Sequence, residues 1–273
     1  MPTKKNIAII GGGNIGRAIA LGLINSGKFS AQNITITRRH IHLLDDLAEK
    51  GFKITSDNNQ AIHNSQIVIL AVQPQQFNDL IESINPILSQ EKHVIISVVS
   101  GVSSNQIVSY LGKKIPVIRA MPNTAIAVGE SITCLASNNA SESDFELTRG
   151  IFDSLGTTVV IDEELMTSAT ALCACGIAFF LRAIRAAAQG GIEIGFHPHQ
   201  AIPMAAQTAK GAADLLLKFG SHPEGEIDKV TTPLGCTISG LNEMEHQGFS
   251  SALIKGIITS ANKASMLYSD REK

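Results

Sequence analysis

The stretch IAIIGGGNIGRAIALGL, residues 7–23, decides the fold of the first half of this chain. A short β-rich run leads through the pattern G-x-G-x-x-G, at Gly11, Gly13 and Gly16, into an apolar pattern with helical period. The first glycine permits a tight turn, the second lets backbone approach a pyrophosphate, and the third allows close helix–strand packing. Free N–H groups at the helix start suit phosphates. The pattern predicts a dinucleotide site; the alternative is a tight turn with a structural role only.

Apolar runs typical of strands recur through the first part of the chain, with helical patterns between the earlier ones. They lie at 6–10, 33–37, 66–72, 93–99, 115–121, 131–136 and 157–161. Strands that alternate with helices at this spacing are typical of a parallel, doubly wound α/β sheet of the Rossmann type. We therefore expect a nucleotide-binding domain over residues 1–162.

After residue 162 the alternation stops and an all-helical domain is expected over residues 163–273. The long Ala-rich stretches lie at 163–190, 198–219, 237–247 and 250–268. These helices are apolar around too much of their circumference for so short a segment to bury alone. The pattern predicts a homo-oligomer, at least a dimer, that associates through this domain.

One segment, residues 165–181, carries no charged side chain and resembles a membrane span. It has 17 residues, including two Thr, one Ser and one Gly, whereas a span needs roughly 20 predominantly apolar residues. We expect instead a helix buried on nearly all sides, and no membrane partner.

The overall charge excludes a nucleic-acid footprint, because 22 basic and 24 acidic residues give a net charge of -2. The chain starts without an apolar segment long enough for a signal peptide. The four cysteines, Cys134, Cys173, Cys175 and Cys236, form no C-x-x-C pair, so reduced, buried, small side chains and a cytoplasmic location are expected. Two H-x-H pairs lack further ligands nearby in sequence, and no metal site is expected.

The end of the second expected strand predicts which dinucleotide is bound. An NAD site usually has an acidic residue there to accept hydrogen bonds from the ribose. This chain has Thr37, Arg38 and Arg39 instead. Two guanidinium groups and a hydroxyl suit a 2′-phosphate, which favours NADPH over NADH. The alternative is a solvated basic helix start.

Over nearly its full length the chain resembles the pyrroline-5-carboxylate reductases, which reduce a cyclic imine to proline with NAD(P)H. The motifs that carry the resemblance are AVQPQ (71–75), SVVSGVSSNQIVSYL (97–111), VIRAMPNTAIAVGE (117–130), AAQTAKGAADLL (205–216) and TTPLGCTISGL (231–241). The resemblance implies interlocked helical domains and rings of dimers. It places cofactor contacts at Asn14, Ile15, Thr37, Arg38, Asn58, Ala71, Val72, Gln73 and Pro74, with Met121, Pro122 and Asn123 on the nicotinamide side.

The chain departs from the family pattern at two segments near the expected substrate pocket. It reads CACGIA at 173–178 where the family commonly has S-G-S-G-P-A, and PLGCT at 233–237 where the family commonly has P-G-G-x-T. Gln73 also replaces a common lysine, which removes a positive charge near the cofactor. These departures leave the substrate range open.

The glycine and threonine residues before the helix at 237–247 offer free N–H groups and a hydroxyl, which suit a carboxylate. We expect this loop to hold a small anionic substrate, with Thr237 as the orienting, catalytic side chain. The expected substrate residues are Gly176, Gly235, Cys236 and Thr237. The alternative is a helix–helix connection with threonine capping. No general acid is evident, so the imine is expected to arrive protonated.

Two other functions stay open at this level. A β-hydroxyacid-type NADP dehydrogenase would use a lysine on the long helix, but residues 169–190 contain none. A non-catalytic paralogue that binds NADPH, with a regulatory or scaffold role, is compatible with the altered CACGIA and PLGCT segments.

Overall fold

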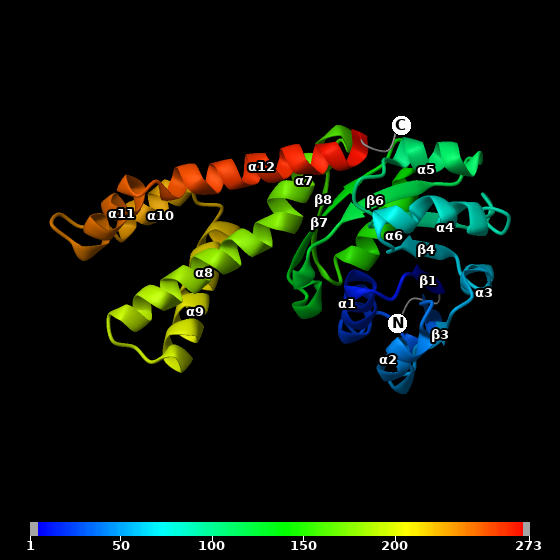
Figure 1. Cartoon of the computed structure of the whole chain (residues 1–273), viewed down its shortest axis with the longest axis horizontal. Coiled ribbons are helices and arrows are strands. Elements are labelled where there is room, and N and C mark those ends of the chain that lie inside the picture. The colour runs from blue at the N-terminus through cyan, green and yellow to red at the C-terminus, as the bar shows by residue number, and fades with distance from the viewer. Residues whose placement is uncertain (1–4, 270–273) are drawn as a thin grey trace. The chain divides into compact units, whose positions relative to one another are not determined.

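The computed structural model describes residues 5–269 (Figure 1). The chain divides into two compact units, one formed by residues 1–174 with 261–273 and the other by residues 175–260. Each unit has its own architecture, an eight-stranded sheet in the first and paired helices in the second. The domain boundary expected after residue 162 stays a prediction.

The sheet of the first unit contains eight strands in the order β3-β2-β1-β4-β5-β6-β7-β8. Every adjacent pair is parallel except β6 and β7, which are antiparallel. The strands are β1 (Ile7–Ile10), β2 (Ile34–Thr37), β3 (Lys53–Thr55), β4 (Ile67–Leu70), β5 (Val94–Ser97), β6 (Val117–Met121), β7 (Ser131–Ala136) and β8 (Gly156–Val160). This topology confirms the expected Rossmann-type α/β unit.

Helices connect the strands of this unit. The α-helices are α1 (Asn14–Asn25), α2 (Asp45–Glu49), α3 (Asn58–His63), α4 (Phe77–Ile84), α5 (Ser104–Leu111), α6 (Glu142–Phe152) and α7 (Met166–Ala169). Short 3₁₀ turns are η1 (Ala31–Asn33), η2 (Ile41–Leu44), η3 (Pro74–Gln76), η4 (Thr124–Val128) and η5 (Glu163–Leu165), and η6 (Thr170–Cys175) is π-helical. Local sequence explains several boundaries: Ser103 caps α5 and Ser141 caps α6, each in a capping box.

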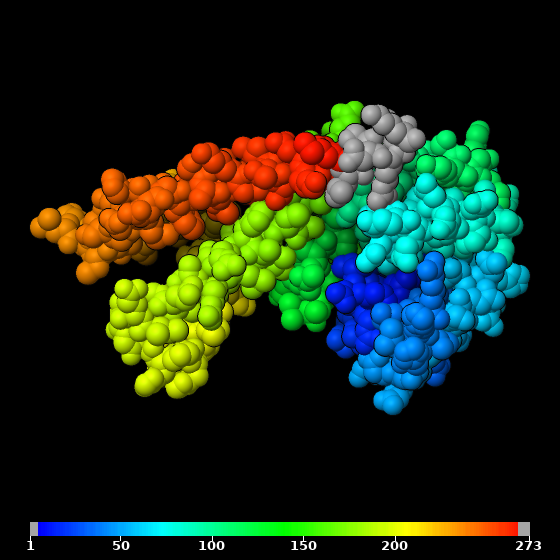
Figure 2. Space-filling model, viewed as in Figure 1, coloured from blue at the N-terminus to red at the C-terminus, as the bar shows by residue number. Residues whose placement is uncertain are grey.

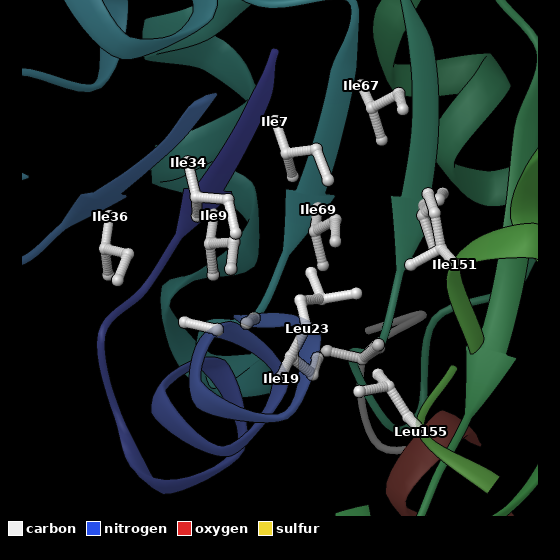
Figure 3. Packing of buried hydrophobic residues seen from close by; sticks show 14 of the residues in the cluster. Ile7, Ile9, Ile19, Leu23, Ile34, Ile36, Ile67, Ile69, Ile151 and Leu155 are labelled. Carbon is white, nitrogen blue, oxygen red and sulfur yellow. The ribbon is translucent and has the colours of Figure 1, made fainter. Parts of the chain in front are cut away.

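Alternating side chains of the strands fill two cores, one on each face of the sheet. On β1, Ile7 and Ile9 enter the first core with Ile19 and Leu23 of α1, as Figure 3 shows. Ala8 and Ile10 enter the second core, with side chains of α3, α4 and α5. Burial on both faces explains why the central strands β1 and β4 read as uninterrupted apolar runs. These cores fix the strand ends that carry the loops of the site.

The second unit consists of helices. They are α8 (Gly176–Glu193), α9 (Pro198–Phe219), α10 (Pro223–Lys229), α11 (Cys236–His246) and α12 (Phe249–Ser269), the last of which continues into the first unit. Small residues bring α8 and α9 together: a Cβ added at Gly191 would lie 3.3 Å from the Ala201 side chain. The pairing of these two long helices confirms an all-helical region after the sheet.

The expectation that the long apolar helix is buried on nearly all sides is wrong for the single chain. Its most apolar window, within Glu163–Glu193, is 17% buried, and by length and composition this helix could cross a membrane. Leu172, Phe180 and Leu181 are each more than half exposed. In Figure 2 one side of α8, drawn in yellow-green, faces the viewer. The described part of a single chain does not supply the cover that so apolar a helix needs.

Candidate active site

The glycine loop between β1 and α1 is shaped by close backbone contacts. Gly11 has φ +113°, and a Cβ there would lie 2.5 Å from the carbonyl oxygen of Ala71. A Cβ at Gly16 would lie 2.1 Å from the carbonyl oxygen of Gly11. Around Gly13, which precedes the first turn of α1, a Cβ would meet nothing within 4 Å. The loop is thus packed tightly on its protein side and open where a phosphate group would approach.

The end of β2 is tied to this loop by three hydrogen bonds. The Gly12 N–H donates to the Thr37 carbonyl oxygen at 2.7 Å, and the Gly11 N–H donates to Thr37 Oγ1 at 3.3 Å. Arg38 Nη1 donates to the Gly12 carbonyl oxygen at 3.0 Å. Arg39 is exposed, whereas Thr37 is buried. The structure therefore places the Arg38 guanidinium group beside the glycine loop, and Arg39 lines the same cleft. Recognition of a 2′-phosphate by these two residues stays a prediction.

A cleft of about 610 Å³ opens at the carboxyl ends of β1, β2 and β4, where open α/β sheets bind ligands. Eight expected cofactor residues line it: Gly11, Gly13, Thr37, Arg38, Arg39, Asn58, Val72 and Gln73. Eight lining residues were not expected: Ile10, Gly12, His40, Ser56, Gln76, Asp79, Leu80 and Ser83. Asp79, Leu80 and Ser83 lie on one face of α4, because residues three or four positions apart share a helix face. That face could have been found from sequence once the cleft was located.

The other expected cofactor residues lie outside the lining of this cleft. Asn14, Ile15 and Gly16 lie in the first turn of α1. Ala71 directly follows β4, and Pro74 begins η3. Met121 ends β6, and Pro122 and Asn123 follow it. Gly16 and Ala71 shape the loop through backbone packing. Met121, Pro122 and Asn123 are buried in the single chain. Their contact with a cofactor stays a prediction.

Asn123 is held in one orientation by its neighbours. Its side-chain oxygen accepts a hydrogen bond from the Ala125 N–H at 3.0 Å, and its Nδ2 donates to the Cys173 carbonyl oxygen at 3.2 Å. The Asn123 N–H donates to Ser131 Oγ at 3.1 Å. This side chain therefore joins the expected nicotinamide segment to the π-helical segment η6.

A buried ion pair supports the same strand. Arg119 Nη1 lies 3.1 Å from Glu163 Oε1, and the two side chains are 3% and 11% exposed. The same Glu163 oxygen accepts a hydrogen bond from the Ser104 N–H at 3.0 Å. Glu163 thus connects the start of α5, strand β6 and the beginning of the long helix. Sequence reasoning missed this connection because Arg119 and Glu163 are 44 residues apart.

In the second unit, the PLGCT segment forms a turn that leads into α11. The Gly235 N–H donates to the Thr232 carbonyl oxygen at 2.9 Å, and a Cβ at Gly235 would lie 2.5 Å from Thr232 Oγ1. No side chain caps α11, and Cys236 and Thr237 at its start are exposed. The threonine cap of the alternative reading is therefore not seen at the start of α11, although Thr231 Oγ1 donates to the Ile227 carbonyl oxygen at the end of α10. The N–H groups of the first turn remain available to an anion.

Two further points complete the comparison with the sequence. Gly176, an expected substrate residue, is buried at the start of α8. Leu234 has φ +59° and is fully exposed, and it is the one non-glycine residue with positive φ between residues 5 and 269. Over the same residues, no group of three or more His, Cys, Asp or Glu side chains is arranged to hold a metal ion.

Known proteins resemble this chain in both halves. Residues 163–267 match the family model for pyrroline-5-carboxylate reductase dimerisation, and residues 6–101 match the model for NADP oxidoreductase, coenzyme F420-dependent. Pyrroline-5-carboxylate reductases 1 and 2 of Dictyostelium discoideum are 52% and 49% identical over 98% and 97% of this chain. The chain spans 50% of the first relative and 94% of the second.

A solved structure gives the same result. The pyrroline-5-carboxylate reductase of Coxiella burnetii is 30% identical, with a TM-score of 0.89 over 97% of this chain and 99% of that one. The helical half therefore carries the family's dimerisation domain. The 49% identity with the second Dictyostelium reductase covers nearly all of both chains, so the family assignment applies to the whole of this chain. The chain belongs to the pyrroline-5-carboxylate reductase family.

Proposed function

We propose that this protein reduces 1-pyrroline-5-carboxylate to L-proline with NADPH, the final step of proline biosynthesis. The observation that carries the proposal is the uncapped, exposed start of α11, where Thr237 follows Gly235. This start belongs to a chain whose other unit holds a dinucleotide cleft. The family assignment supports the same reaction and counts against the β-hydroxyacid dehydrogenases.

The residues of the cleft fit a nicotinamide dinucleotide with a 2′-phosphate. Gly13 leaves space beside the first turn of α1, where N–H groups suit a pyrophosphate. Arg38 and Arg39 provide the positive charge and donors for the 2′-phosphate, and Thr37 orients the glycine loop. We therefore propose NADPH as the preferred cofactor, with NADH bound less tightly. Bound NADPH supplies the hydride that reduces the carbon of the imine double bond.

The start of α11 is proposed to bind and orient the substrate. The N–H groups of its first turn and the Thr237 hydroxyl form a site for the carboxylate of a small cyclic imine. Residues 231–237, TTPLGCT, contribute no charged side chain that would compete for it. We assign Gly235 and Cys236 to the same site through their backbone, and Gly176 to its neighbourhood. A protonated imine needs no strong acid from the protein, which agrees with the neutral character of this loop.

Residues 1–162 are proposed as the cofactor domain and residues 163–273 as the substrate and dimerisation domain. The dimerisation model begins at residue 163, which supports this division. We propose that two chains interlock through their helices, that dimers assemble further into rings, and that each active site combines the cofactor domain of one chain with the α11 loop of another. In this assembly the partner chain, and not a lipid bilayer, covers the exposed side chains of α8. A cytoplasmic location agrees with the four free thiols.

Steady-state kinetics of Thr237→Ala test the substrate assignment. Loss of a hydrogen bond to a charged group is worth about 1.5–3 kcal/mol, so kcat/KM for the imine should fall by about tenfold or more. The dissociation constant of NADPH, measured by fluorescence titration, should stay unchanged. Ser239→Ala is the matched control, because Ser239 lies on the same helix and bonds its own turn at the Gly235 carbonyl oxygen.

The control variant should retain the wild-type kcat/KM for the imine. If Thr237→Ala also keeps wild-type imine kinetics, the loop is only a connector between α10 and α11. If both variants lose activity equally, the effect comes from a disturbed helix start and not from the Thr237 hydroxyl.

A further inference from the structure

Two thiols of the first unit face each other between strand β7 and the π-helical segment η6. Cys134 lies on β7 and is 5% exposed, and Cys173 lies in η6 and is partly exposed. Their sulfur atoms are 3.8 Å apart. A disulfide requires about 2.05 Å, so a closure of under 2 Å by side-chain rotation and a small shift of η6 would join them. From the sequence these cysteines are expected to be reduced and buried, whereas Cys173 is only partly buried.

The surroundings of the pair connect it to the expected nicotinamide segment. Cys134 is paired with Met121 in the antiparallel ladder of β6 and β7, and both belong to a small apolar cluster against which Cys173 packs. The backbone carbonyl of Cys173 accepts the hydrogen bond from Asn123 Nδ2. A covalent link between the two sulfur atoms would therefore act on Met121 and Asn123 through direct contacts.

The two thiols have unequal acidity. The hydrogen bond from the Cys134 thiol lowers the pKa of Cys173 to about 7. The same hydrogen bond, together with burial, raises the pKa of Cys134. At neutral pH a share of Cys173 is thus the nucleophilic thiolate, and Cys173 is also the more exposed of the two. An attacking thiolate beside a buried resolving thiol is the arrangement that redox-responsive pairs require.

We propose that Cys134 and Cys173 form a reversible disulfide that switches the reductase to a less active state. The effect on the rate rests on the proposed function, whereas formation of the bond does not. The oxidant is a small-molecule disulfide of the glutathione type.

The reaction proceeds in two exchange steps. The Cys173 thiolate attacks one sulfur of the small disulfide, whose S–S bond breaks, and one small thiolate leaves and takes up a proton. The Cys134 thiol then loses its proton to solvent, and its sulfur attacks the Cys173 sulfur of the mixed disulfide and releases the second small thiolate. Two protein thiols are oxidised, and one small disulfide is reduced to two thiols.

The expected consequence follows from the position of η6. Pulling Cys173 toward β7 shifts the carbonyl that orients Asn123 and the segment that leads directly into Gly176. Oxidation should lower kcat/KM for the imine by about tenfold, the size expected when one hydrogen bond of the site is lost. The bond should also raise the melting temperature, because it closes a loop between residues 39 apart in the chain.

The test uses the full-length protein incubated with oxidised glutathione. Alkylation and peptide mass spectrometry should show a Cys134–Cys173 disulfide in the wild type, with reduced activity that dithiothreitol restores. Cys134→Ser and Cys173→Ser should keep wild-type activity when reduced and lose the response to the oxidant. Cys175→Ser, two positions from Cys173, is the matched control and should respond as the wild type does.

The disulfide and its effect on the rate can each be overturned separately. Failure to detect the disulfide in the wild type overturns the site itself, whatever the variants do. A disulfide that leaves kcat/KM unchanged overturns the switch. If the reduced wild type does not reduce the imine, the proposed function fails, and NADPH affinity measured before and after oxidation then decides the switch: an unchanged affinity overturns it and a weakened affinity supports it.

Discussion

Arg38 donates a hydrogen bond from Nη1 to the carbonyl oxygen of Gly12, 3.0 Å away. This contact joins a residue that we propose to select the 2′-phosphate to the loop that we propose to receive the pyrophosphate. By this proposal the same side chain serves both parts of the dinucleotide. Arg39, its neighbour, is exposed in the same cleft.

The two arginines are expected to differ when each is replaced by alanine. Arg38→Ala should weaken the binding of NADPH by about 1.5–3 kcal/mol, since a charge-assisted hydrogen bond to phosphate is lost. NADH should weaken less, through the released Gly12 contact alone. Arg39→Ala should weaken NADPH and leave NADH unchanged, because no part of the loop depends on it. Fluorescence titration measures the dissociation constants of NADPH and NADH for each of the two variants. Equal losses of affinity for NADPH and NADH in Arg38→Ala would reject the phosphate assignment.

Leu234 is expected to destabilise the loop before α11. A non-glycine residue with φ near +59° carries strain of about 1–2 kcal/mol, and an exposed leucine loses little packing when replaced. Leu234→Gly should raise the free energy of unfolding by up to about 1 kcal/mol, because glycine's entropy in the unfolded chain offsets part of the relief. Leu234→Ala is the control and should not stabilise, since alanine keeps the strain. Denaturation at one fixed protein concentration measures both, and stabilisation by alanine would contradict the strain argument.

The buried ion pair of Arg119 and Glu163 predicts a large effect on the free energy of unfolding. Glu163→Ala leaves the buried charge of Arg119 without this carboxylate and should lower the free energy of unfolding by about 3–5 kcal/mol. Glu142→Ala removes an exposed partner of Arg149 and should change it by under about 1 kcal/mol. Urea denaturation of the two variants side by side is the measurement. Similar small decreases in the free energy of unfolding in both variants would show that Glu163 does not stabilise the fold through this ion pair.

The exposed apolar side chains of α8 predict that association depends on them. Phe180 is 61% exposed, and burying a Phe side chain contributes about 1.5–3 kcal/mol. Phe180→Asp should therefore shift the protein toward monomers, as measured by light scattering at micromolar concentration. Val128→Asp, at an exposed apolar residue of the first unit, should leave the oligomer intact. A wild type that is a stable monomer would refute the interface.

Much of the fold followed from sequence because its signals are local. Seven of the eight strands were expected, since each is a short run rich in apolar or β-branched residues, although no residue of β8 is buried in the single chain. Strand β3, Lys53–Thr55, was missed because it has three residues at a sheet edge and a single large apolar side chain. Helix α10, Pro223–Lys229, was missed because PEGEIDK is short and polar, with no apolar face to reveal it.

The site could be read from sequence only where its residues form one loop. The glycine pattern and the end of β2 located the cofactor cleft, because strand order at a Rossmann sheet brings those loops together. The contacts of Glu163 with Arg119, and of Cys134 with Cys173, depend on chain segments 44 and 39 residues apart. Tertiary packing alone creates such pairs, and no local pattern predicts them.

The oxidation of NADPH, followed by absorbance with 1-pyrroline-5-carboxylate as the second substrate, tests the central claim most directly. The account predicts NADPH oxidation that depends on the imine, proline formed in equal amount, and slower turnover when NADH replaces NADPH. A purified, folded oligomer that binds NADPH but does not oxidise it with the imine would contradict the account and favour a non-catalytic role.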